Sequence, residues 1–89
     1  MNTNKPTRAT RFFHEAAQRC IASHVTVDCD SAYSTVSIDA PGEESIFMQG
    51  GEADEFIAKR DALCKRYPSL SLDVAELALA EPYAETIWG

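Results

Sequence analysis

The spacing of the apolar residues changes twice along this chain, and the two changes limit the folds that it can adopt. From Phe12 to Ile21, apolar residues recur at spacings of one, three and four. This period is typical of an amphipathic helix, which we expect over about residues 7–23. Over residues 25–49 apolar and polar residues alternate, which indicates β-strands. Beyond residue 50 the helical spacing returns.

The alternating region divides into three short runs, at residues 25–29, 33–39 and 45–49. The pairs Asp30-Ser31 and Pro41-Gly42 separate these runs, and both are typical of tight turns. Strands joined by such short turns pair with their neighbours in the sequence. The sequence therefore predicts an antiparallel meander of three strands. Only one face of this sheet needs to be apolar, which leaves the other face available to water or a partner.

A second helix follows the third strand. We expect it to begin at residue 51 or 52, after Gly50, and to end by Tyr67, before Pro68. Acidic residues crowd its first turn and basic residues lie toward its end, as the helix dipole favours. Its expected buried stripe contains Ala53, Phe56, Ile57, Leu63, Cys64 and Tyr67.

The last part of the chain allows two interpretations. Residues 69–80 could form a short helix that begins after Ser71 and is interrupted at Glu81-Pro82. The alternation over residues 70–74 could instead indicate an edge strand. A last apolar turn is expected to be held against the core or another subunit through Tyr83, Ile87 and Trp88.

The elements follow the order α-β-β-β-α-α, with the helices segregated from the sheet. This order predicts an α+β fold, in which a three-stranded antiparallel meander packs on helices. Residues 1–89 are expected to form a single domain, because smaller pieces could not bury a core of their own. The expected core residues are the in-phase apolar positions Phe12, Phe13, Ala16, Cys20, Val25, Val27, Val36, Ile38, Phe56, Ile57, Leu63 and Leu77.

No stretch approaches the roughly 20 apolar residues that a membrane span needs, and no apolar signal-peptide core is visible. We therefore expect a cytoplasmic protein without a membrane partner. The three cysteines include no CxxC pair, which favours reduced, mostly buried thiols over a disulfide framework or a zinc site. A chain of this size buries a limited share of its surface, so a homodimer stays an open alternative.

Three patterns in the sequence could suggest a functional site, and the residues argue against each of them. His14 and Cys20 are six residues apart on a helix and so point to different faces, which leaves the thiol without a local base. The run 28–31 resembles the opening of a calcium loop, but Tyr33 stands where the loop needs glycine, which favours an Asx turn. Gly50-Gly51 lacks a phosphate-binding motif and is expected to permit a tight strand-to-helix turn. We expect no catalytic residue, no metal and no cofactor.

Charge is sorted along the chain. Residues 25–57 carry eight acidic side chains and no lysine or arginine, whereas residues 1–24 and residues 58–66 each sum to +3. Sorted charge creates a directional field that steers charged partners. The net charge of −6 opposes direct binding of nucleic acid, whose affinity comes mostly from phosphate neutralisation.

The acidic block predicts a binding surface for a host protein with a basic surface, because a negative rim speeds the capture of such a partner. The candidate partner-binding residues are Asp39, Glu43, Glu44, Glu52, Asp54 and Glu55. In the alternative interpretation these carboxylates serve only solvation and the start of a helix.

Three segments of the chain, residues 48–57, 69–79 and 82–88, resemble small orphan proteins encoded by bacterial phages and prophages. The resemblance covers roughly the C-terminal half. That class includes anti-CRISPR and other anti-defence proteins, so the resemblance implies a non-enzymatic inhibitor that binds and blocks a factor in the host-cell cytoplasm. It assigns no role to any residue, because the class shares no common site. The alternative is a small homodimeric structural or accessory domain with no inhibitory role.

Overall fold

The computed structural model describes the backbone of residues 8–88 and the side chains of residues 8–85. The expected positions of the Ile87 and Trp88 side chains lie outside this range. The described elements are α1 (Arg8–Ala22), β1 (Thr26–Asp30), β2 (Thr35–Asp39), β3 (Ile46–Gln49), α2 (Gly51–Arg66) and α3 (Leu72–Trp88). Their order confirms the predicted α+β fold.

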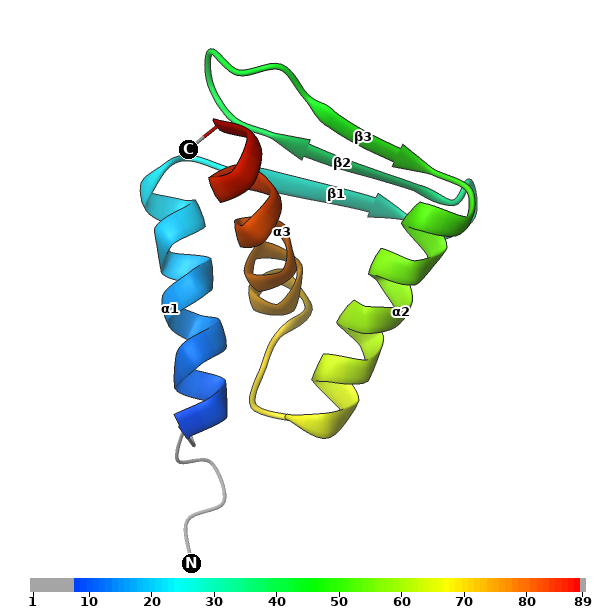
Figure 1. The fold of residues 1–89 in the computed structure, drawn as a ribbon. Coiled ribbons are helices and arrows are strands. Elements are labelled where there is room, and N and C mark those ends of the chain that lie inside the picture. Colours follow the sequence, from blue (N-terminus) through cyan, green and yellow to red (C-terminus); the bar gives the residue numbers. More distant parts are fainter. Residues whose placement is uncertain (1–7, 89) are drawn as a thin grey trace, which may run out of the picture.

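The three strands form one antiparallel sheet in the order β1-β2-β3, as the turn signals predicted. All three helices lie on the same side of the sheet, with α3 between α1 and α2 (Figure 1). The strand residues that point toward the helices include Val36, Ile38 and Met48, which are almost completely buried. The other face of the sheet is not covered by any described element (Figure 1).

The turn between β1 and β2 is an Asx turn, as predicted. The Asp30 carboxylate accepts hydrogen bonds from the backbone amides of Ala32 and Tyr33, at 3.0 and 3.3 Å. The turn is longer than expected, because β2 begins at Thr35 and not at Tyr33. The side chain of Tyr33 is 79% exposed, so it belongs to the turn and not to the packed face of a strand.

The turn between β2 and β3 contains Pro41 and Gly42. The amide of Glu43 donates to the carbonyl of Ala40 at 3.1 Å, and Gly42 has a φ of 77°. These features match a type II turn, in which proline suits the second position and the third requires a positive φ. The turn reverses the chain, and Glu44 and Ser45 connect it to β3, which pairs with β2.

The predicted bounds of α2 are confirmed. Gly50 has a φ of 66°, which glycine adopts without steric cost, and the helix runs from Gly51 to Arg66. Tyr67 ends it by donating its amide to the carbonyl of Leu63 at 2.8 Å. The stripe is buried only in the half near the sheet, at Ala53, Phe56 and Ile57, and becomes half-buried at Leu63, Cys64 and Tyr67.

The edge strand considered for residues 70–74 is wrong, and so is the interruption at Glu81-Pro82. Leu72–Trp88 is one helix with Pro82 inside it, and the Ser71 hydroxyl caps its start by accepting the Val74 amide at 3.2 Å. Buried alanines hold the helix in place, because their small side chains allow close packing on α1 and the sheet. Proline bends a helix without ending it when such packing supports both sides, and α3 changes direction in Figure 1.

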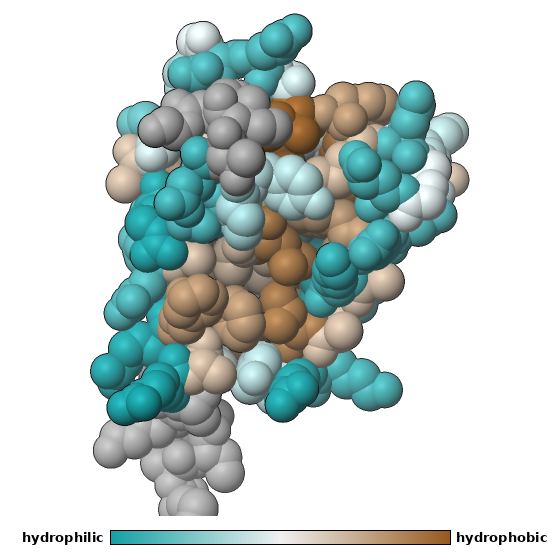
Figure 2. Space-filling model, viewed as in Figure 1, coloured by the Kyte–Doolittle hydropathy of each residue, from teal (hydrophilic) through white to brown (hydrophobic). Residues whose placement is uncertain are grey.

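The core lies between the sheet and the ends of the helices nearest to it. Of the expected core residues, seven are buried: Ala16, Cys20, Val25, Val36, Ile38, Phe56 and Ile57. Phe13, Val27, Leu63 and Leu77 are only partly buried. Away from the sheet, apolar side chains reach the surface between the polar outer sides of α1 and α2 (Figure 2).

The prediction that Phe12 is buried is wrong, because its side chain is 63% exposed. Helix α1 packs mainly on α3, so it needs only a narrow buried stripe of Thr10, Ala16, Ala17 and Cys20. Phe12 lies beside this stripe and contacts the ring of Phe13 edge-on, with the ring centroids 5.6 Å apart. Periodicity marked the apolar side of the helix but could not show how wide the contact would be.

Candidate partner-binding surface

The six predicted partner-binding residues fall into two groups at opposite ends of the sheet. Asp39, Glu43 and Glu44 lie at the end that carries the turn between β2 and β3. Glu52, Asp54 and Glu55 lie in the first turns of α2, which follows the other end of β3 (Figure 1). The length of β3 therefore separates the two groups, and they do not form one compact cluster.

Asp39 has the most constrained carboxylate in the first group. It accepts a hydrogen bond from the Ser37 hydroxyl at 2.9 Å and another from the Ser45 hydroxyl. The bond from Ser45, followed by that from Ser37, holds the pKa of Asp39 below its usual value. Glu43 and Glu44 are exposed in the adjacent turn. This end of the sheet therefore carries one firmly ionised carboxylate beside two exposed ones.

The second group lies where the α2 dipole favours negative charge. Glu52, Asp54 and Glu55 are all exposed. Glu55 forms an ion pair with Lys59 at 3.3 Å, one helical turn away. Both side chains of this pair are more than 60% exposed, so it contributes little to stability, but it partly neutralises Glu55. Glu52 and Asp54 keep their charge uncompensated among the described side chains.

The uncovered face of the sheet joins the two groups, and of its residues only Asp39 was among the predicted site residues. We call it the open face; it consists of Thr26, Asp28, Asp30, Thr35, Ser37, Asp39, Phe47 and Gln49. It carries three aspartates and no basic residue. Asp28 is exposed in the middle of β1, and its carboxylate has no hydrogen-bond or ion-pair partner in the part of the chain that the structure describes.

The alternation of apolar and polar residues in β1 already indicated part of this face. Val27 and Cys29 turn toward the helices, so Asp28 and Asp30 must turn away from them. The run Ile46-Phe47-Met48 is apolar throughout and does not show which residue turns outward. Only the pairing register places Phe47 on the open face, where its side chain is 58% exposed.

Four of the seven basic residues in the described part of the chain lie at the far end of the molecule. Helix α1 begins and α2 ends away from the sheet (Figure 1), which puts Arg8 and Arg11 at that end together with Lys65 and Arg66. The basic residues closer to the sheet have acidic partners. Arg19 pairs with Glu81 at 3.0 Å. The acidic block of residues 25–57 and the described basic residues without an ion pair thus lie at opposite ends of the molecule.

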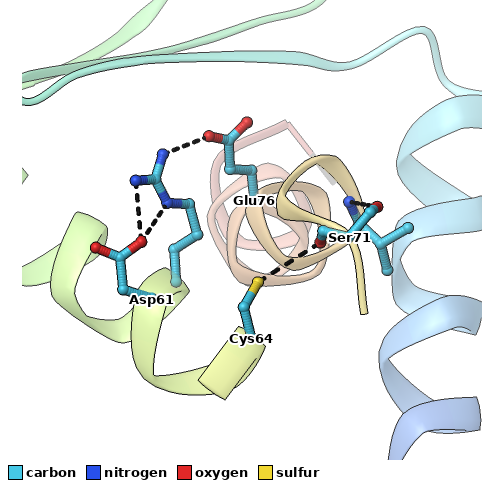
Figure 3. A network of polar contacts seen from close by, with 6 residues as sticks. Asp61, Cys64, Ser71 and Glu76 are labelled. Atoms are coloured by element: carbon cyan, nitrogen blue, oxygen red, sulfur yellow. Dashed lines mark hydrogen bonds and ion pairs between the residues drawn. The ribbon is translucent and has the colours of Figure 1, made fainter. Parts of the chain in front are cut away.

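Arg60 lies between helices α2 and α3 and forms the most buried ion pair of the described residues. Its Nη1 donates to the Glu76 carboxylate at 2.8 Å, and its Nε donates to Asp61 at 3.0 Å (Figure 3). The side chains of Arg60 and Glu76 are only 16% and 13% exposed. Nearby, the Cys64 thiol approaches the carbonyl of Ser71 at 3.7 Å. These contacts join the two helices and engage the Arg60 guanidinium with two carboxylates.

The three cysteines are free thiols with raised pKa values. Burial, followed by the negative charge of Glu76, raises the pKa of Cys29 to about 12. Burial is also the main cause that raises the pKa values of Cys20 and Cys64. Because the thiolate is the nucleophile, a raised pKa makes each of these groups unreactive near neutral pH. Only Cys20 is fully buried, so the expectation of mostly buried thiols is met in part.

A cleft of about 480 Å³ opens beside the first acidic group. It lies between the end of α1, the turn between β2 and β3, and the last part of α3. Its charged lining residues are Arg19, Glu43, Glu81 and Glu85. Arg19 is engaged by Glu81, so the cleft has a net negative charge and extends the acidic surface around this end of the sheet.

The side chains of residues 8–85 include no group of three or more histidine, cysteine or acidic residues placed to hold a metal ion. None of the described helices has the length and apolarity needed to cross a membrane. Comparison with protein-family models, curated proteins and solved structures gives no match to this chain.

Proposed function

We propose that this chain is a non-enzymatic phage or mobile-element protein that binds and blocks a basic surface of a host protein. The target in this proposal is a surface that normally holds nucleic acid, as in a CRISPR complex or another defence factor. The observation that supports it is the separation of charge in space. The eight acidic residues of the block 25–57 lie on the sheet, in its turns and at the start of α2, and the described basic residues without an ion pair lie at the other end of α1 and α2.

Such a distribution favours one orientation of approach. A protein with an acidic end and a basic end turns its acidic end toward a positive surface before contact, which raises the association rate. The acidic end also presents an uncovered sheet face, which can make contact without rearranging the core. Carboxylates on this surface compete with phosphates for the same lysines and arginines, and this competition is the proposed means of inhibition.

Binding without catalysis is favoured by the state of the ionisable groups. The thiols of Cys20, Cys29 and Cys64 have raised pKa values and are poor nucleophiles at neutral pH. The partly buried charges of Arg60 and Glu76 satisfy each other. Direct binding of nucleic acid is disfavoured by the three aspartates of the open face, which would repel phosphates.

The alternative function is a homodimeric structural or accessory domain. The observation in its favour is the set of exposed apolar side chains, Phe12 and Phe47 among them, on a chain with a small core. A dimer would bury such side chains against a second copy. This alternative predicts an oligomeric state that depends on concentration and no salt-sensitive partner.

The test is capture of partners from bacterial lysate on the tagged 89-residue chain, at about 50 mM and about 300 mM salt, with identification by mass spectrometry. We expect a nucleic-acid-binding protein that is retained at low salt, lost at high salt and displaced by added nucleic acid. A partner that is indifferent to both salt and nucleic acid would contradict the proposal. A self-associating chain that captures no partner would favour the accessory domain.

A further inference from the structure

The open face has one feature that solvation does not explain. Its exposed residues are polar except for Phe47, whose side chain is 58% exposed in the middle of β3. Phe47 lies in the same row across the sheet as Ser37 and Asp28, because Ser37 pairs with both Phe47 and Asp28 in the strand register. An aromatic ring and a carboxylate therefore stand on either side of a small hydroxyl side chain.

The spacing of this row suits a flat cation. Neighbouring strands lie about 4.8 Å apart, so the Cβ atoms of Asp28 and Phe47 are about 10 Å apart across Ser37. A guanidinium group above Ser37 could stack on the Phe47 ring and donate two hydrogen bonds to the Asp28 carboxylate. A lysine ammonium could form the ion pair but lacks the planar, forked shape that serves both contacts.

The charges around the row favour the same occupant. Asp28 has no partner among the described residues, whereas Asp30 and Asp39 are held by turn and serine hydrogen bonds. Those two aspartates flank the row on the same face and add negative potential around it. A second copy of this chain is a poorer occupant, because two acidic faces would repel each other.

We propose that the row Asp28–Ser37–Phe47 is the docking point for an arginine of the partner protein. This inference rests on the proposed function and adds the residue type that the partner presents. Basic residues that flank this arginine in the partner would extend toward Glu43 and Glu44 at one end of the sheet and toward Glu52 and Asp54 at the other. The open face thus serves as the centre of the contact, and the two acidic groups serve as its margins.

The test is an NMR titration of the ¹⁵N-labelled 89-residue chain with two short peptides at about 50 mM salt, where screening is weak. One peptide contains glycine and arginine, and the other has the same length and charge with lysine in place of arginine. We expect the arginine peptide to bind at least about threefold more tightly, and to shift the amides of Asp28, Ser37 and Phe47 most strongly.

Two variants should remove this preference. Phe47→Thr deletes the ring and keeps a residue that suits a strand, and Asp28→Asn deletes the charge and keeps the shape. Each variant should weaken binding of the arginine peptide by about threefold or more. Phe47→Thr should leave binding of the lysine peptide unchanged. The matched controls are Phe12→Ala and Glu15→Gln, which change an exposed ring and an exposed carboxylate on α1 and should have no effect. Melting curves confirm that each variant folds.

Three results would overturn the inference. The two peptides could bind equally, the largest shifts could lie at residues 43–45 or 51–55, or the open-face amides could shift when the chain alone is diluted. The first two results leave the proposed function standing, because the acidic margins could still capture a basic surface. The third result means that a second copy covers this face. The proposed function fails separately, if its captured partner is indifferent to salt and nucleic acid.

Discussion

Cys29 shows how the environment of a single residue sets its chemistry. Because burial and Glu76 raise the pKa of its thiol to about 12, only about one thiol in ten thousand is ionised at pH 8. We expect iodoacetamide to modify Cys29 far more slowly in the native chain than in the urea-unfolded chain, as measured by peptide mass spectrometry. The folded pKa lies above the reference value of 9.0, so the stability that this thiol contributes is lost as the pH rises from 9.0 toward 12. Equal rates in the two states would contradict this assignment.

Asp39 offers a second test at the same scale. Its lowered pKa is attributed first to the Ser45 hydroxyl, so Ser45→Ala should raise this pKa toward the usual value. The measurement is a ¹³C NMR titration of the carboxyl group. Ser31→Ala, at an exposed position in the turn between β1 and β2, is the control and should leave Asp39 unchanged. The lowered pKa contributes stability above the unfolded pKa, and this contribution is lost as the pH falls through the folded one.

At the scale of elements, α2 is packed unevenly along its length. The side chain of Ile57 packs toward the sheet and is only 7% exposed. The side chain of Leu63, near the far end of the helix, is only half-buried. Ile57→Ala should therefore lower the free energy of unfolding by about 2 to 5 kcal/mol, because it leaves a cavity that the core cannot fill. Leu63→Ala should lower the free energy of unfolding by clearly less. Urea unfolding measures both, and equal losses would mean that the packing of α2 is uniform.

Helix α3 contains a proline at the position where the sequence predicted that the helix would be interrupted. Pro82 has no N–H to donate to the carbonyl of Ala78, and its ring crowds the preceding turn. Pro82→Ala should therefore raise the free energy of unfolding, by up to about 3 kcal/mol in urea unfolding. Pro68→Ala, in the loop between α2 and α3, is the control and should not stabilise the chain. A loss of stability in Pro82→Ala would show that the bend itself is needed for packing.

At the scale of the whole molecule, we expect the position of a charge to affect the association rate more than the total net charge does. Reversal of Glu43 with Glu44, or of Glu52 with Asp54, to lysine should slow association with the captured partner and weaken its salt dependence. The control reverses Glu15 with Asp73, two exposed acidic residues on helices away from the open face, and gives the same change in net charge. Equal slowing by the control would mean that only net charge acts. Melting must accompany the Glu52 and Asp54 reversal and also the control, because Asp73 lies in the first turn of α3 and lysines at a helix start cost about 0.5 to 1 kcal/mol each.

The sequence alone determined the local features of this protein. The switch of apolar period from 3.6 to 2 and back specified the helices and strands, because each period matches one backbone geometry. Glycine, proline and aspartate marked the turns and the start of α2, because their effects on the backbone do not depend on distant residues. The acidic block was visible in the same way, since a count of charges needs no structure.

Only the tertiary structure decided what depends on contacts between distant residues. It showed that residues 72–74 belong to a helix that continues through Pro82, because buried alanines pack that helix on α1 and the sheet. It left Phe12 exposed, since the width of a buried stripe is set by the neighbour that covers it. It also separated the six predicted acidic residues into two groups and placed Phe47 and Asp28 between them, because strand register and not sequence spacing determines which side chains share a face.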